Sequence, residues 1–150
     1  MTTEILKADL SHLEFIINSQ VTMAMETENF ELSRKTVTAG VSALFEDSNK
    51  GRYFVAKING ELAGALLIVD EWSDWRCATV LWIHSVFVVK EHRKKGVYKS
   101  LYLHIKQMVE NDNSFAGIRL YVDKTNKTAT AVYRGLGMTD EHYNLFEWLK

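Results

Sequence analysis

The chain has 150 residues, of which 47% are hydrophobic and 25% charged, and this composition is typical of one globular domain spanning residues 1–150. The formal net charge of −1 provides no basic field for nucleic acid or an anionic membrane, so neither partner is expected. The single cysteine, Cys77, excludes an internal disulfide, and the N-terminal segment lacks the apolar core of a signal peptide. These features favour a cytoplasmic protein.

The first half of the chain predicts strands and helices in alternation. Residues 3–9 alternate between polar and apolar side chains and predict a short strand. Apolar residues at helical spacing predict two amphipathic helices, over 9–29 and 32–45. Residues 52–72 then predict two strands, joined by a type I′ turn at Asn59-Gly60.

The second half predicts a β-rich run over 77–89, an amphipathic helix over 96–112, a strand over 117–122 and a helix over 126–137 that ends at a glycine. One or two further strands are expected in residues 138–150. Three consecutive strands before the long helix favour an α+β fold with a mixed sheet. The strands on either side of that helix should be parallel and joined by a right-handed crossover.

The stretch KEHRKKGVYKS, residues 90–100, lies between a predicted strand and a predicted helix. The first amides of a helix have no partners within the helix, and the helix dipole places partial positive charge there. Gly96 lets an anion approach the backbone, and Arg93, Lys94 and Lys95 add full positive charges. The stretch therefore indicates an anion site, with a solvated basic turn as the alternative.

Within the longer stretch VFVVKEHRKKGVY, Arg93 and Gly96 match the Arg/Gln-x-x-Gly-x-Gly/Ala loop that binds the acetyl-CoA pyrophosphate in GNAT N-acetyltransferases, although Tyr98 replaces the last small residue. NKTATAVYRGLGM resembles the family's second element through four matching residues: Asn126, Ala129, Tyr133 and Gly137. EWSDWR, WIHSVFV and RLYV are similar to a bacterial subgroup of the same family. The resemblance spans the chain and implies a GNAT fold, a splayed central sheet and acetyl-CoA as co-substrate.

The resemblance also implies which residues hold acetyl-CoA: Phe87, Val88, Val89, Arg93, Lys94, Lys95, Gly96, Val97, Tyr98, Asn126, Ala129 and Tyr133. Tyr133 would be the acid that protonates the departing thiolate; its alternative role is an interior helix tyrosine. A backbone amide near Phe87 or Val88 would receive the thioester oxygen, where the family often has a bulge. Asn126 would bond the pantetheine arm, cap the helix, or do both.

The general base is predicted from chemistry, because the strand before the loop carries no carboxylate. His84 is the titratable group there, and its ordinary pKa near 6.5 suits a base at neutral pH. Strand alternation would place Trp82, His84 and Val86 on one face and Phe87 on the other. A structural histidine is the alternative, and Asp70, Glu71 and Asp74 are rival bases.

An acceptor site for a cationic amine is expected around DEWSDWRCA, because aromatic rings and carboxylates suit a cation. Its predicted residues are Glu28, Glu71, Trp72, Asp74 and Trp75, and Glu26 beside Glu28 could add further acidity. The alternatives are a loop anchored to the core by its tryptophans and solvated charges at Glu26 and Glu28.

The histidines show no metal-ligand spacing with Cys77 or with one another, so no metal is expected. The sequence thus predicts an acetyl-CoA-dependent N-acetyltransferase that acts on a primary amine of a small molecule or on an exposed amino group of a peptide. A catalytically silent acyl-CoA sensor or scaffold of the same fold is the alternative. Nucleic-acid binding through KEHRKK is not favoured, since no aromatics interleave with the run. Apolar strands at the C-terminus could support a homodimer.

Overall fold

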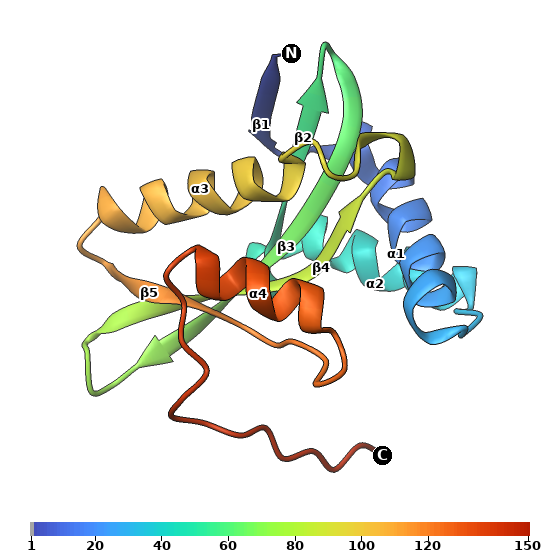
Figure 1. Ribbon diagram of the computed structural model, residues 1–150. Coiled ribbons are helices and arrows are strands. Elements are labelled where there is room, and N and C mark those ends of the chain that lie inside the picture. The colour runs from blue at the N-terminus through green and yellow to red at the C-terminus, as the bar shows by residue number, and fades with distance from the viewer. Residues whose placement is uncertain (1) are drawn as a thin grey trace. The chain divides into compact units, whose positions relative to one another are not determined.

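The computed structural model describes residues 2–150 and contains one five-stranded sheet in the order β1-β2-β3-β4-β5 (Figure 1). The strands are β1 (Thr3–Lys7), β2 (Arg52–Ile58), β3 (Glu61–Ser73), β4 (Ala78–Val88) and β5 (Phe115–Leu120). Neighbouring strands are antiparallel except β4 and β5, which are parallel. The predicted mixed sheet and the parallel pair around the long helix are therefore confirmed.

The helices are α1 (Leu13–Glu28), α2 (Arg34–Glu46), α3 (Val97–Glu110) and α4 (Lys127–Gly135), with short 3₁₀ turns at Leu10–His12, Ser48–Lys50 and Lys90–His92. Polar caps hold the 3₁₀ turn that leads into α1 and the start of α2. The Asp9 carboxylate accepts the Ser11 amide at 2.9 Å, and the Ser33 hydroxyl accepts the Thr36 amide at 3.3 Å. Asn59 and Gly60 have φ of 50° and 85°, which confirms the predicted type I′ turn.

The sheet is covered on both faces. On one face, Ile16 and Ile17 of α1 and Val41 of α2 pack against Tyr53, Val55 and Ala65 of the sheet. On the other face α3 packs closely, because Gly64 of β3 leaves room for two of its side chains, Val97 and Leu101. The N-terminus of α3 is thereby held at the end of β4. Within residues 2–150, no helix combines the length and apolar composition needed to cross a bilayer.

We expect Gly64→Ala to lower the free energy of unfolding by about 2 kcal/mol. The added Cβ would lie 2.9 Å from the Phe87 carbonyl oxygen and 3.1 Å from a Val97 methyl, so β4 or α3 would have to move. Urea unfolding measures the change. Gly117→Ala in β5 is the control, because nothing lies within 4 Å of its Cβ position. Equal stability of the two variants would contradict the close packing of α3.

The chain divides into two compact units: the first ends at Leu120, and the second comprises Tyr121–Lys150. In the second unit α4 ends as predicted, with Gly137 at φ 87°. The Gly137 amide donates to the Arg134 carbonyl at 3.0 Å and the Met138 amide to the Tyr133 carbonyl at 3.1 Å, which is a Schellman cap. The strands predicted in residues 138–150 are wrong. This segment is neither helix nor strand, since a strand needs ladder hydrogen bonds and none of the described residues forms them with it.

Candidate active site

The basic loop after β4 leads directly into α3. Lys94 and Gly96 have φ of 60° and 78°, so two left-handed residues turn the chain before the helix begins at Val97. The hydrogen-bond ladder of α3 starts with the Ser100 amide, which donates to the Gly96 carbonyl at 3.0 Å. Within residues 2–150, the amides of Gly96 and Val97 donate no hydrogen bond. They point out of the helix end, where an anion would be bound.

The charged side chains of the loop are used in two different ways. Lys94 and Lys95 are exposed and form no ion pair with any described residue. Arg93 is instead engaged: its Nε donates to the Val88 carbonyl at 2.9 Å, and its Nη2 donates to Glu26 Oε2 of α1 at 2.6 Å. The two lysines can therefore face an anion, while the arginine ties the loop to α1.

Tyr98 departs from the family pattern without filling the loop. Its ring lies 6.4 Å from the ring of Tyr102, one helical turn further along α3. The tyrosine side chain is thus directed along the helix. Gly96 remains the residue at the turn itself.

A β-bulge interrupts β4 just before the loop. Ala65 of β3 pairs with Phe87 and Leu67 with His84, so Ser85 and Val86 together stand opposite a single residue of β3. Ser85 has φ 51°, a left-handed conformation that a residue with a side chain rarely adopts. The last β4–β5 pair is Ile83 with Leu120, so residues 84–88 run on without a β5 partner. The central strands therefore separate at the level of the bulge.

The bulge corrects the predicted faces of β4. His84 stands opposite Leu67 and Phe87 stands opposite Ala65, and both of these β3 residues pack on the α1–α2 cluster. Opposed residues of an antiparallel pair share a face. His84 and Phe87 therefore lie on the same face, and the prediction that they lie on opposite faces is wrong because the extra residue shifts the alternation.

His84 is half-buried beside a second ring on the same strand. The imidazole and the Trp82 indole are stacked, with centroids 6.2 Å apart and planes at 23°. Burial lowers the pKa of His84 below its ordinary value of 6.5. The imidazole is therefore neutral at pH 7 and can accept a proton.

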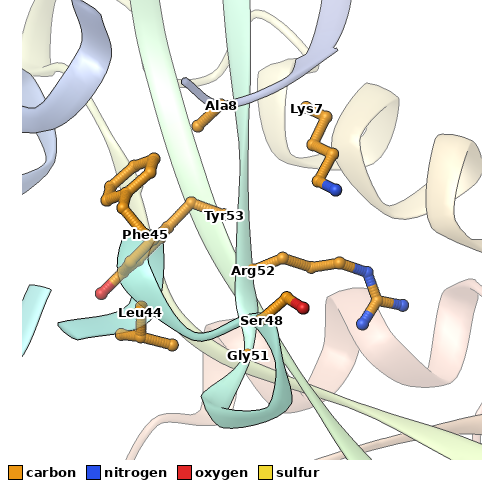
Figure 2. Close-up of a pocket in the computed structure, with 8 residues that line it drawn as sticks. All are labelled: Lys7, Ala8, Leu44, Phe45, Ser48, Gly51, Arg52 and Tyr53. Atoms are coloured by element: carbon orange, nitrogen blue, oxygen red, sulfur yellow. The ribbon is translucent and has the colours of Figure 1, made fainter. Parts of the chain in front are cut away.

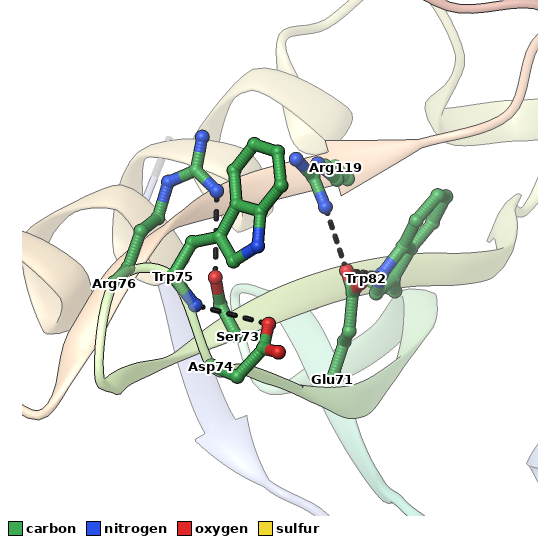
Figure 3. A network of polar contacts seen from close by, with 7 residues as sticks. All are labelled: Glu71, Ser73, Asp74, Trp75, Arg76, Trp82 and Arg119. Atoms are coloured by element: carbon green, nitrogen blue, oxygen red, sulfur yellow. Dashed lines mark hydrogen bonds and ion pairs between the residues drawn. The ribbon is translucent and has the colours of Figure 1, made fainter.

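A polar network that includes Trp82, whose ring stacks on His84, joins three strands (Figure 3). Glu71 Oε1 of β3 accepts the Trp82 indole N–H at 2.8 Å and an Arg119 N–H of β5 at 2.8 Å. The indole hydrogen bond first, and then the Arg119 hydrogen bond and charge, hold the pKa of Glu71 below its ordinary value, although burial opposes them. Sequence reasoning missed Trp82 and Arg119, and the one signal for Arg119 was a charge inside an otherwise apolar strand.

The hairpin after Glu71 projects away from the basic loop. Trp72 and Trp75 are 64% and 90% exposed, so the alternative that they anchor the loop to the core is wrong. Asp74 accepts the amide of Trp75 at 3.0 Å (Figure 3). The eleven residues of β4 separate this tip from the basic loop, a distance of roughly 35 Å along the strand. Glu71 lies closer to His84 than the tip does, because it stands opposite Val80 within the sheet.

Glu28, the remaining acceptor residue predicted from sequence, is exposed at the end of α1. It forms no ion pair within the described part of the chain. Asp70, a rival base, is paired with Arg52 at 3.0 Å.

The second motif forms α4 and both of its ends. Asn126 is the N-cap, and its Oδ1 accepts the Ala129 amide at 3.0 Å. Tyr133 is half-buried in the last turn, and its carbonyl is held by the C-terminal cap. The spacing of the motif is thus also the spacing between the two caps of one helix.

A hollow of about 230 Å³ lies near β1 and α2, but the polar side chains that line it do not point toward a common centre (Figure 2). Lys7 and Arg52 point to one side of it, whereas Leu44, Phe45 and Tyr53 point to the other. Burial raises the pKa of Tyr53 to about 12, so its phenol is neutral. Across residues 2–150, no three His, Cys, Asp or Glu side chains are grouped to hold a metal ion.

Comparison with known proteins agrees with this arrangement. The sequence profile of the acetyltransferase (GNAT) family matches residues 19–138. The crystal structure of a possible acetyltransferase from Clostridium difficile 630 has 38% identity and a TM-score of 0.92, covering 100% of this chain and 99% of that one. No curated protein sequence matches the chain.

Two more distant crystal structures share the fold. A predicted acetyltransferase from Clostridium acetobutylicum, determined with acetyl-CoA, has 15% identity and a TM-score of 0.71 over 99% of this chain and 95% of that one. An aminoglycoside acetyltransferase from an uncultured soil metagenomic sample has 19% identity and a TM-score of 0.75 over the whole of both chains. With a family profile that matches most of its length, the chain belongs to the GNAT family of acetyltransferases.

Proposed function

We propose that the chain is an acetyl-CoA-dependent N-acetyltransferase that acetylates a primary amine of a small molecule or an exposed amino group. The observation that carries this proposal is the end of α3, where the amides of Gly96 and Val97 lie beside Lys94 and Lys95. Two phosphate groups with their negative charges fit that combination of amides and cations. The chain is proposed to act as one domain, because the family match runs through both of its compact units.

The separation of β4 and β5 suits the pantetheine arm of the acyl donor. Residues 84–88 of β4 lack a β5 partner, so their outer backbone groups can pair with an extended, amide-containing chain. We assign Phe87 and Val88 to contacts with the thioester end and Val89 to the strand end above the loop. Asn126, Ala129 and Tyr133 are assigned to donor binding on their match to the family motif.

Transfer forms a C–N bond to the acetyl carbon and breaks its C–S bond. The amine nitrogen gives up a proton, and the departing sulfur takes one up. We propose that His84 accepts the proton from the amine and that the Tyr133 phenol donates the proton to the sulfur. His84 is preferred to its rivals because it is held neutral, whereas Glu71 has a lowered pKa and Asp70 is paired with Arg52. The third rival, Asp74, lies at the hairpin tip, far from the basic loop.

The acceptor is proposed to approach over the face of the sheet that carries Glu71, Trp82 and His84. Aromatic rings and a carboxylate there suit an ammonium group before it is deprotonated. Glu28 is retained as an outer contact at the end of α1. Trp72, Asp74 and Trp75 are retained as contacts for the distal part of a long acceptor, since the hairpin tip lies far from the basic loop.

Calorimetry with CoA and acetyl-CoA, followed by a thiol-release assay over a panel of amines, tests this function. Binding of both ligands and release of CoA with at least one amine are expected. Binding without release from any amine would favour an acyl-CoA sensor. Absence of binding at millimolar concentration would remove the assignment altogether.

Two further properties remain proposals. The cytoplasm is the proposed location, since that compartment supplies acetyl-CoA. A homodimer is proposed from the large apolar residues of the last segment, Tyr143, Leu145, Phe146, Trp148 and Leu149. Light scattering of the full chain with and without substitutions in this segment measures the oligomeric state.

A further inference from the structure

The Arg93 side chain joins two segments that are 67 residues apart in sequence. Its Nη2 donates to Glu26 Oε2 at 2.6 Å, and its Nε donates to the Val88 carbonyl at 2.9 Å. Its guanidinium carbon lies 5.7 Å from the centre of the Phe87 ring. One guanidinium is thus fixed by an acid, a carbonyl and an aromatic face.

The conformation of the basic loop after β4 depends on these contacts of Arg93. The bond between Arg93 and Val88 closes the segment that leaves β4, and Lys94 directly after it is in the unfavourable left-handed region. The amides of Gly96 and Val97 follow within four residues. Where these amides point is therefore set by where Arg93 is held.

Glu26 provides the rigid side of this contact. It lies in the last turn of α1, a helix anchored by side chains buried in the core. An acidic residue at a helix C-terminus is unfavourable unless a cation pairs with it, and Arg93 is that cation. Each of the two side chains is 38% exposed, so neither is held by burial alone.

We propose that Glu26 is a positioning residue for the acyl donor, holding the loop through Arg93 in the conformation that receives the diphosphate. This inference rests on the proposed function. It also gives Arg93 a different use from a phosphate ligand. If Arg93 bound the phosphates itself, Glu26 would compete with them, and its removal would strengthen binding.

The sign of the effect of Glu26→Gln on the dissociation constant of CoA tests the proposal. We expect about fivefold weaker binding by calorimetry, the size of effect produced by losing one ion pair within a network. The KM for acetyl-CoA should rise by the same factor, while kcat and the melting temperature stay unchanged. Glu31→Gln is the matched control, because it removes the same charge from an exposed position five residues along without breaking an ion pair of the described chain.

Arg93→Lys keeps the positive charge, but a lysine ammonium cannot donate to Glu26 and to the Val88 carbonyl in the planar geometry of a guanidinium. This variant should weaken CoA binding at least as much as Glu26→Gln does. The double variant should bind CoA little more weakly than Arg93→Lys alone, because both substitutions break the same contact. Tighter or unchanged binding by Glu26→Gln, a loss equal to that of Glu31→Gln, or full additivity in the double variant would overturn the inference. Failure of the wild-type chain to bind CoA would instead overturn the proposed function.

Discussion

Replacement of Tyr133 by phenylalanine is expected to lower the rate of acetyl transfer about 100-fold, at the low end of the range for loss of a general acid. The phenol would no longer supply the proton that the departing thiolate needs, while the ring would still fill its place in α4. The caps of α4 use the side chain of Asn126 and the backbone around Gly137, so the helix should remain intact. Single-turnover kinetics at saturating acetyl-CoA measure the chemical step directly.

Tyr143→Phe is the control for this substitution, because it removes a phenol from an exposed tyrosine in the same unit of the chain. Its rate should equal that of the wild type. CoA affinity should be the same in both variants, because phenylalanine keeps the ring assigned to donor binding and removes only the phenol that protonates the departing sulfur. A Tyr133→Phe enzyme that keeps half or more of the single-turnover rate would exclude Tyr133 as the acid.

Local patterns in the sequence predicted most of the fold. The Asn59-Gly60 turn, the left-handed Gly137 and the Asp9-capped turn that leads into the first helix depend on residues within a few positions of one another. The parallel pair of β4 and β5 followed from the helix between them. The strand prediction for residues 138–150 was wrong. Apolar residues suit a strand, but a strand also needs a partner to pair with, and no local pattern reveals whether that partner exists.

The site was less predictable, because its groups meet across strands. The bulge at Ser85 leaves no mark in SVFVV, yet it moves Phe87 to the face of His84. The network of Glu71, Trp82 and Arg119 needs the register of three strands. The Glu26–Arg93 pair needs the packing of α1 beside the loop. Motif matching identified the loop itself, since its glycine and its charges are adjacent in sequence.

The pH dependence of turnover should identify His84. Burial lowers the pKa of this imidazole, so the folded protein favours the neutral form that a base requires. As the pH falls through that lowered pKa, the ring becomes protonated and kcat/KM should decline, with the decline lying below pH 6.5. Above that pKa, kcat/KM should no longer depend on the ionisation of His84. Any further rise in kcat/KM with pH should follow the deprotonation of the amine.

His84→Gln should lower kcat about 100-fold and abolish the acid limb, because glutamine cannot accept the proton at any pH in this range. His104→Gln is the matched control: His104 also lies against an aromatic ring, with its centroid 5.6 Å from that of Phe54, but it belongs to α3 on the other face of the sheet. This control should keep both the rate and the acid limb. An acid limb that persists in the His84 variant would assign the titrating base to another group. Glu71, the carboxylate of the neighbouring network, is then the candidate, and because its pKa is held below the ordinary carboxyl value of 4.5, its limb would lie below pH 4.5.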